Sequence, residues 1–225
     1  MHLYETHLHT STVSACANST PLEQVNAYKQ RGYTGVIVTD HFYTSYARHS
    51  GKSSWQGKIE FFASGFCEAK KAGSLLGLDV FFGWEYTAEG LDFLTYGLDE
   101  SFLLKNPQLE RGVTIKEYSR LVRDNGGYLA QAHPCREAYW IDNPRTADPK
   151  LIDGVEVLNT SDTDRANQKA RKFAKANRLP IQAGSDSHSH CMGYAASGVI
   201  LERKADSIHD IISEIRTFRV QLIEA

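Results

Sequence analysis

Long hydrophobic runs, paired cysteines and an excess of charge are all absent from this 225-residue sequence. No segment approaches the roughly 20 apolar residues that a membrane span needs, and the first residues carry neither the basic nor the apolar part of a signal peptide. Four cysteines in a chain of this length, none in a CxxC pair, are typical of a reduced, intracellular protein. We therefore expect a cytoplasmic protein with no membrane partner.

The charges nearly cancel, with 25 Lys and Arg against 27 Asp and Glu and a formal net charge of −2. Such a balance gives no broad basic surface, so nucleic acid is not expected as a partner except as a nucleotide or oligonucleotide substrate. Any anionic substrate would have to be held by local charge. Repeats and Pro-, Gly- or Ser-rich linkers are also lacking, and the length fits a single domain over residues 1–225.

Short apolar runs alternate with longer amphipathic segments, a pattern typical of βα units around a parallel sheet. Strands are predicted at residues 2–7, 35–39, 79–84, 93–97, 128–132, 154–158, 180–184 and 198–201. Helices are predicted at residues 21–31, 58–76, 115–124, 164–177 and 207–217. Capping-box patterns at Thr20–Glu23 and Thr114–Glu117 mark two helix starts. The polar segment 43–55 is predicted to be a long loop, and such loops are often functional.

A His-x-His pair lies at the end of the first predicted strand, at His7 and His9. Side chains two apart on a strand point to the same face, so these two imidazoles could share one metal ion. The pair alone is weak evidence, because His-x-His also occurs by chance.

Further His and acidic residues fall at the ends of other predicted strands. His7, His41, Glu85, His133 and Asp186 each lie within two residues of such an end. In parallel α/β barrels the carboxyl ends of the strands build the active site. Imidazole and carboxylate together suit Zn²⁺, Mn²⁺ or Fe²⁺, and with His9 and His188 these ligands exceed what one ion can bind. We expect two or three divalent metal ions.

Five ordered motifs carry a resemblance to a known family. They are His7-Leu8-His9-Thr10-Ser11, Thr39-Asp40-His41, Gly83-Trp84-Glu85, Ala132-His133-Pro134 and Gly184-Ser185-Asp186-Ser187-His188. In order and spacing they resemble the motifs of the PHP (polymerase and histidinol phosphatase) domain family. The resemblance implies a distorted, TIM-like (β/α)7 barrel, α/β in class, with a multinuclear centre that hydrolyses phosphate esters.

The resemblance also implies a division of the ligands. His7, His9, Glu85 and Asp186 would hold one ion, Glu85 would bridge to a second ion held with His133, and His41 with His188 would hold a third. The family usually supplies an Asp or His after the His-x-His motif and often another His before His133, and both are missing here. Cys16 and Asp92 are the candidate substitutes. A buried structural cysteine is the competing interpretation of Cys16.

Other polar residues are predicted to act around the ligands. Arg136 could clasp a phosphate or form a surface salt bridge. Asp186 is the candidate proton shuttle as well as a ligand. Asp40 is expected to orient a neighbouring His by a hydrogen bond. Glu156 has no assigned role.

These features predict a metal-dependent phosphoesterase that acts on a small phosphorylated substrate, a phosphate monoester as in histidinol phosphatase, with metal-bound hydroxide as nucleophile. Two alternatives stay open: an amide or lactone hydrolase on the same barrel, and a non-catalytic regulatory PHP domain. The substrate, the metal and the oligomeric state are not predicted.

Overall fold

The structure is a computed structural model that describes residues 1–42, 47–48, 50–139, 141, 143–191 and 197–223. Residues 43–46 and 49 of the loop predicted at 43–55 lie outside the described residues. Among the described helices, none has both the length and the apolar content needed to cross a membrane.

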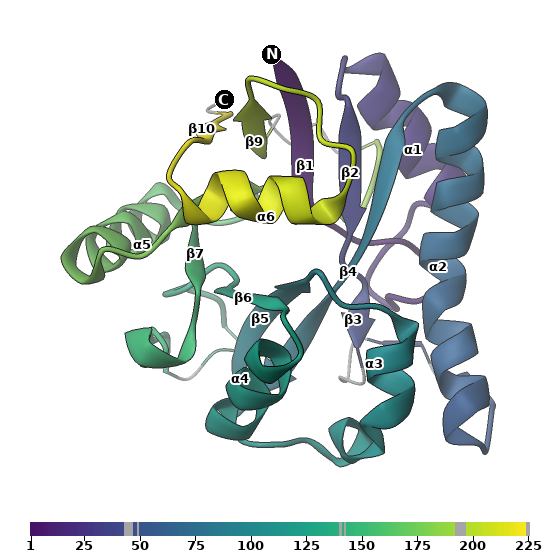
Figure 1. Cartoon of the computed structure of the whole chain (residues 1–225), viewed down its shortest axis with the longest axis horizontal. Coiled ribbons are helices and arrows are strands. Elements are labelled where there is room, and N and C mark those ends of the chain that lie inside the picture. The colour runs from purple at the N-terminus through teal and green to yellow at the C-terminus, as the bar shows by residue number, and fades with distance from the viewer. Residues whose placement is uncertain (43–46, 49, 140, 142, 192–196, 224–225) are drawn as a thin grey trace.

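The strands form one mixed sheet in the order β10-β9-β1-β2-β4-β5-β6-β7-β8, with β3 paired to β4. Their bounds are β1 His2–Leu8, β2 Gly35–Val38, β3 His41–Phe42, β4 Asp79–Ala88, β5 Leu91–Tyr96, β6 Tyr128–Gln131, β7 Gly154–Asn159, β8 Ile181–Gly184, β9 Val199–Leu201 and β10 Gln221–Leu222. Strands β1, β2 and β4 run parallel, as do β6, β7 and β8. The short strand β9 runs antiparallel to β1, and β10 runs antiparallel to β9 at the edge of the sheet (Figure 1).

The sheet nearly closes into a barrel, because the segment after β8 returns to the end of β1. Asp186 donates its backbone N–H to the carbonyl of His7 at 3.0 Å, and His9 donates to the carbonyl of Ser187 at 3.0 Å. The predicted barrel fold is thus confirmed. This seam brings the first and the last predicted ligand motifs side by side.

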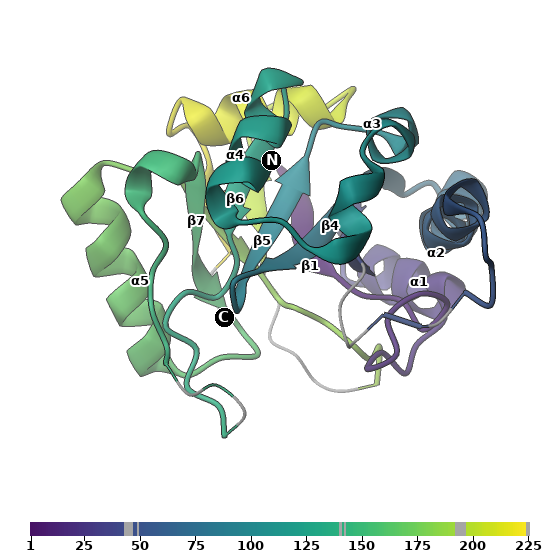
Figure 2. The same cartoon turned by 90° about the horizontal axis from the view of Figure 1, so that it is seen from below.

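Helices surround the strands (Figures 1 and 2). They are α1 Pro21–Gln30, α2 Trp55–Leu76, α3 Glu100–Lys105, α4 Ile115–Asp124, α5 Asp164–Asn177 and α6 Ile208–Arg216, with 3-10 turns at Pro107–Arg111 and Pro149–Leu151. Both predicted capping boxes are present, at the starts of α1 and α4. Short elements such as β3 and α3 were not predicted.

The prediction of a parallel sheet is wrong at β4 and β5, which form an antiparallel hairpin. The chain turns at Glu89 and Gly90, both with positive φ (50° and 75°), the backbone geometry of a tight two-residue hairpin. Strand β4 continues to Ala88, so Glu85 lies within it and not after it. Because β5 runs in the opposite direction, its first residues, including Asp92, lie at the end of the barrel that carries Glu85.

Aromatic and aliphatic side chains fill the space between the sheet and the helices. Below the predicted site, the Tyr96 hydroxyl donates to the carbonyl of Thr6 at 2.7 Å and accepts from Gln182 Nε2 at 2.9 Å. These buried hydrogen bonds tie β1, β5 and β8 together inside the barrel. The site therefore rests on a packed layer that these hydrogen bonds hold together.

Candidate metal centre

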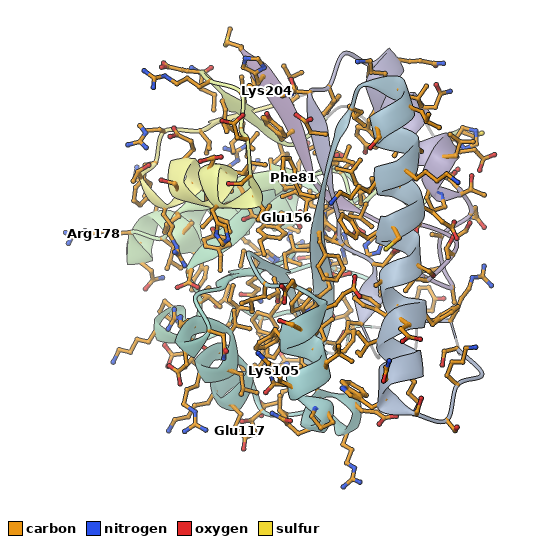
Figure 3. The ribbon with its side chains drawn as sticks, turned by 45° about the vertical axis from the view of Figure 1, so that its right-hand side comes forward. Phe81, Lys105, Glu117, Glu156, Arg178 and Lys204 are labelled. Atoms are coloured by element: carbon orange, nitrogen blue, oxygen red, sulfur yellow. The ribbon has the colours of Figure 1, made fainter. Side chains whose placement is uncertain are left out.

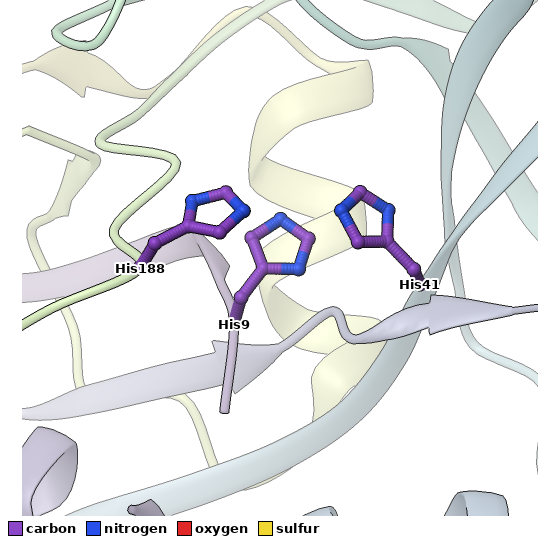
Figure 4. A group of neighbouring side chains, drawn as sticks. All are labelled: His9, His41 and His188. Atoms are coloured by element: carbon purple, nitrogen blue, oxygen red, sulfur yellow. The ribbon is translucent and has the colours of Figure 1, made fainter. Parts of the chain in front are cut away.

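All seven predicted His, Glu and Asp ligands converge at one end of the barrel. They come from β1 and the residue after it (His7, His9), β3 (His41), β4 (Glu85), the end of β6 (His133) and the segment after β8 (Asp186, His188). Except for His188 they are buried. His9, His41 and His188 lie as close neighbours in Figure 4 although they are far apart in the sequence.

The Glu85 carboxylate lies in the middle of the cluster. Its Oε2 atom is 3.5 Å from His7 Nε2, 3.4 Å from His9 Nε2 and 2.9 Å from His41 Nδ1, and its Oε1 is 2.8 Å from His133 Nε2. Oε2 is buried, and its neighbours in these pairs are all imidazole nitrogens. A buried carboxylate is costly unless a cation compensates its charge, and imidazole nitrogens with carboxylates are a donor set that suits Zn²⁺, Mn²⁺ or Fe²⁺. The residues therefore fit divalent metal ions.

His7 is held in one tautomer by Glu156. The Glu156 Oε1 atom lies 3.0 Å from His7 Nδ1, while its Oε2 accepts from the His133 backbone N–H at 2.8 Å and from Asn159 Nδ2 at 2.9 Å. A proton on Nδ1 shared with Glu156 leaves the lone pair of His7 Nε2 directed at the centre. This is the carboxylate–histidine arrangement that orients metal ligands. Figure 3 shows Glu156 in the interior of the molecule.

His9 is oriented by a chain of hydrogen bonds through Ser14. The Ser14 hydroxyl donates its one proton to Asp40 Oδ1 at 2.7 Å, so it acts as acceptor for His9 Nδ1 at 3.2 Å and for the His41 backbone N–H at 3.1 Å. Asp40 also accepts from the Thr10 N–H and hydroxyl. The predicted orienting role of Asp40 agrees with this geometry, acting through Ser14.

His188 is also held in one tautomer, in this case by a backbone carbonyl. Its Nδ1 lies 2.8 Å from the carbonyl of Asp186, which places the proton on Nδ1 and the lone pair on Nε2. Donor atoms of His9, His41 and His188 lie within 4.8 Å of one another, as do those of His7, His133 and Asp186. The ring nitrogens of these imidazoles thus converge closely enough for several of them to bind the same metal ion.

The electrostatics favour cations. Burial raises the pKa of Glu85 and of Asp186, but His41 and His7 for Glu85, and His7 and Arg136 for Asp186, outweigh it and hold both pKa values well below their usual range. Burial lowers the pKa of His7, yet Glu156, Asp186 and Glu85 raise it well above its usual value. Without metal, protons on the imidazoles balance the carboxylates. Metal ions would displace those protons.

Arg136 contacts a ligand of the cluster. Its Nη2 donates to Asp186 Oδ2 at 2.7 Å and to Asn159 Oδ1 at 3.2 Å, and its Nε lies 3.7 Å from Asp162 Oδ2. Arg136 lines the same cavity as the cluster. Its interaction helps to keep Asp186 ionised, which suits a metal ligand and makes Asp186 a weak base for the predicted role as proton shuttle.

The two candidate substitutes lie at the outer side of the cluster. Asp92 has a carboxylate oxygen within 4.8 Å of donor atoms of Glu85 and His133, and it accepts from the Thr87 hydroxyl at 2.6 Å. Burial raises the pKa of the Cys16 thiol, and the nearby imidazoles of His188 and His41 lower it to about 7. Among the described residues, the Cys16 sulfur joins none of the groups whose donor atoms all lie within 4.8 Å of one another. Both side chains line the cavity of about 420 Å³ that opens over the cluster.

Backbone strain gathers at the same place. His133 (φ 26°), Cys135 (φ 69°) and Asp186 (φ 55°) adopt positive φ although none is glycine. Such conformations cost about 1–3 kcal/mol each and persist where the surrounding structure enforces them, often at functional sites. At Gly184 a Cβ atom would come within 2.5 Å of both Glu156 Oε1 and the His7 Cβ. Only glycine there permits the approach of Glu156 to His7.

The sequence prediction missed the anchors of the ligands. Ser14 was not singled out, and Glu156 was left without a role although it contacts His7. Its position within the predicted strand 154–158 was the available signal, but its partner depends on how β7 meets β1 across the barrel. His2, His190 and His209 lie outside the cluster, and the structure pairs His190 with Ser19.

Comparisons with known proteins agree with the fold. The family model described as PHP-associated matches residues 164–220. A search of the curated proteins found no match. The structure is similar to a candidate metal-dependent phosphoesterase from Bifidobacterium adolescentis, with 15% identity, 95% of each chain covered and a TM-score of 0.62.

Two further solved structures are similar. One is a two-domain protein from Bacteroides vulgatus with a region predicted to be a PHP-like metal-dependent phosphoesterase (15% identity, 99% of this chain and 64% of that chain covered, TM-score 0.71). The other is an amidohydrolase from Chromobacterium violaceum with bound sulfate and no metal (14% identity, 97% of each chain covered, TM-score 0.63). The family-model match lies in the last third of the chain, and the solved structures share its fold, so the comparisons agree with the resemblance of the five ordered motifs to the PHP domain family.

Proposed function

We propose that the protein is a metal-dependent phosphoesterase that hydrolyses a small phosphate monoester. The observation that carries the proposal is the position of Glu85 Oε2, which is buried and lies 2.9–3.5 Å from nitrogens of three imidazoles, His7, His9 and His41. An arrangement of this kind is expensive to bury without cations. The likeness to structures named as metal-dependent phosphoesterases supports this choice of reaction.

Three groups of donors would hold the ions. His7, His9, Glu85 and Asp186 would form the innermost group, Glu85, Asp92 and His133 the second, and His41 and His188 with His9 the third, near which Cys16 is the candidate additional ligand. Bound Zn²⁺, Mn²⁺ or Fe²⁺ would supply a water molecule of lowered pKa and neutralise phosphoryl oxygens. Two ions would fill the first two groups. A third ion would be held by His41 and His188 with His9, and Cys16 would complete its ligands if the thiolate binds.

The chain's own residues would position the substrate and handle the proton. Asp186 belongs to the innermost group and is held ionised, so its carboxylate would serve first as a metal ligand, and as the proton shuttle it would be a weak base while it remains hydrogen-bonded to Arg136. Arg136 adds a cation at the cavity wall, where it would attract the phosphoryl group. Because the net charge is −2, affinity for phosphate must come from Arg136 and the ions.

The proposal is tested by assaying generic phosphomonoesters with protein stripped of metal and reloaded with Mn²⁺ or Zn²⁺. Hydrolysis is expected only in the loaded protein, and it should be lost in Asp186→Ala and His41→Ala. His209→Ala, an exposed His on α6, is the matched control and should retain activity. Activity that persists in metal-stripped Asp186→Ala would contradict the proposal. Elemental analysis of the loaded protein decides between two ions and three.

A second candidate is an amide or lactone hydrolase, favoured by the structural likeness to an amidohydrolase. The same metals would polarise a carbonyl oxygen instead of a phosphoryl oxygen. Cyclic amides and lactones assayed beside the phosphomonoesters separate the two reactions. Metal binding without hydrolysis of either substrate class would support a non-catalytic domain.

A further inference from the structure

A β-bulge in β1 lies directly at the His-x-His motif. Against β2, Tyr4 pairs with Gly35 and Glu5 with Val36, but the next pair is Leu8 with Val38, so β1 holds one extra residue. A bulge leaves a backbone N–H outside the ladder and re-aims the side chains that follow it. The N–H of His7 is such a group, and it needs another acceptor.

That acceptor is Glu5. Its Oε1 atom accepts from the His7 N–H at 2.9 Å and from the Ser185 N–H at 3.0 Å. Its Oε2 atom accepts from the Tyr28 hydroxyl of α1 at 2.9 Å, and Tyr28 is 2.6 Å from the Ser185 hydroxyl. The Glu5 side chain is 0% exposed. One oxygen of this carboxylate therefore joins the bulge in β1 to the residue before Asp186.

The two backbone groups that share Oε1 belong to opposite ends of the chain, and each adjoins a predicted ligand. His7 is itself a ligand in β1, and Ser185 immediately precedes Asp186, whose positive φ of 55° is one of the strained conformations at the site. Asp186 in turn donates its N–H to the carbonyl of His7. Glu5 thus joins β1 to the segment after β8 directly beside His7 and Asp186. The position of these two backbone segments sets the distance between His7 Nε2 and Asp186 Oδ1, which is 3.5 Å.

We propose that Glu5 is a positioning residue that sets the spacing of His7 and Asp186 for metal binding, acting from outside the cavity that the substrate would enter. A buried carboxylate with no cationic partner among the described residues is an expensive way to build a core, and a hydrophobic residue would serve packing alone. The two backbone N–H groups that share its Oε1 atom, those of His7 and Ser185, explain why a carboxylate is present at this position. The inference rests on the proposed function only in that the centre binds divalent metal.

The two oxygens of Glu5 give a test with matched variants. Glu5→Met keeps the length of the side chain and removes both acceptors, so the His7 and Ser185 N–H groups lose their partner. Tyr28→Phe removes only the contact at Oε2 and leaves the backbone contacts intact. Glu5→Gln retains one carbonyl oxygen that can accept from both N–H groups and serves as the conservative rescue.

The measurement is calorimetric titration of Zn²⁺ or Mn²⁺ into the metal-free protein, with the metal-induced rise in Tm as a second readout. We expect Glu5→Met to weaken metal affinity by about 10- to 100-fold, as for other residues that orient ligands. Tyr28→Phe and Glu5→Gln should stay within about threefold of the wild type, even where the Tm of the metal-free protein falls. If Glu5→Met does not fold, Glu5→Asp, which withdraws the carboxylate by one methylene, should still weaken affinity measurably.

Two results would overturn the inference: wild-type affinity in Glu5→Met or Glu5→Asp, or an equal loss in Tyr28→Phe. The second result would mean that Glu5 contributes only to stability. Because the readout is metal binding, it is independent of the reaction. Weakened binding in the Glu5 variants together with no phosphatase activity in the wild type would support the role of Glu5 and contradict the proposed function.

Discussion

The inner and outer sides of the metal centre are built differently. On the inner side, His7 and His9 are 0% exposed, and their Nδ1 atoms contact the buried residues Glu156 and Ser14. On the outer side, Cys16 is exposed and Asp92 and His188 are only half-buried. The inner ligands are therefore preorganised by groups that have no other function, whereas the outer ligands border the cavity and are held by fewer contacts.

This difference coincides with the departures from the family pattern. The inner residues match the motifs of the PHP family, and both substitutions, Cys16 and Asp92, fall on the outer side. Changing an inner ligand breaks several buried hydrogen bonds at once, since a buried polar group left without its partner is costly. Changing an outer ligand disturbs mainly the ion it binds. We expect the effects of mutation to decline from the inner to the outer side.

The largest effect is expected for Asp186→Asn. The change removes a negative charge between His7 and Arg136 and a predicted ligand together, so metal affinity and activity should fall by more than about 100-fold. The measurement is metal content after dialysis, followed by the rate of phosphomonoester hydrolysis. Asp153→Asn, which affects a pair with Arg123 outside the site, is the matched control. Full metal content in Asp186→Asn would show that the inner side does not depend on this ligand.

A smaller loss, about 10- to 100-fold in metal affinity, is expected for Glu156→Gln. The amide would present an N–H₂ group to at least one of the donors that Glu156 now accepts from, namely His7 Nδ1, the His133 N–H and Asn159 Nδ2. The ring of His7 would then lose its fixed tautomer. Titration of Zn²⁺ into the metal-free variant measures the loss, with Glu137→Gln, an exposed carboxylate beside Lys169, as control. Unchanged affinity would mean that packing alone orients His7.

The metal-free protein should lose stability as the pH rises. Burial lowers the pKa of His41, but Glu85 outweighs it and raises the pKa from 6.5 to about 10. A His with a raised folded-state pKa contributes stability that is fully present below pH 6.5 and is lost as the pH rises through about 10. Glu85 and Asp186 have lowered pKa values and are ionised throughout this range, so they do not change the stability with pH here.

Thermal unfolding checks this pH dependence. The Tm of the metal-free protein should fall between about pH 6.5 and about pH 9, while the increase in Tm produced by metal should grow, because metal competes with protons for the imidazoles. A Tm of the metal-free protein that stays constant or rises over this range would contradict the protonation of His41.

The features that could be predicted from the sequence depend on residues close together in the chain. The capping boxes at Thr20 and Thr114 depend on residues three apart, so the starts of α1 and α4 were predicted correctly. In a parallel barrel the carboxyl ends of the strands meet at one end, so residues at strand ends are expected to lie close together. The structure does bring the predicted ligands His7, His133 and Asp186 together.

Contacts between distant segments could not be predicted. The hairpin of β4 and β5 was missed because an apolar run does not reveal the direction of its partner. The roles of Ser14, Glu156 and Glu5 depend on which side chains meet across the barrel seam, where a one-residue bulge changes the register. No spacing within the sequence contains that information.

The smallest effect is expected on the outer side, for Cys16→Ser. The thiol lines the cavity with His41 and His188, and these imidazoles lower its pKa to about 7, so the thiolate is accessible near neutral pH. If it binds a third ion, the variant should lose one ion per chain and retain the inner ions, with activity reduced by less than in Asp186→Asn. Loading with Co²⁺ gives a direct readout, because a thiolate ligand adds an intense charge-transfer absorption band that serine cannot produce. Cys67→Ser, at an exposed position on α2, should leave the band intact. Equal metal content and identical spectra in Cys16→Ser and wild type would show that the centre stops at two ions and that Cys16 only lines the cavity.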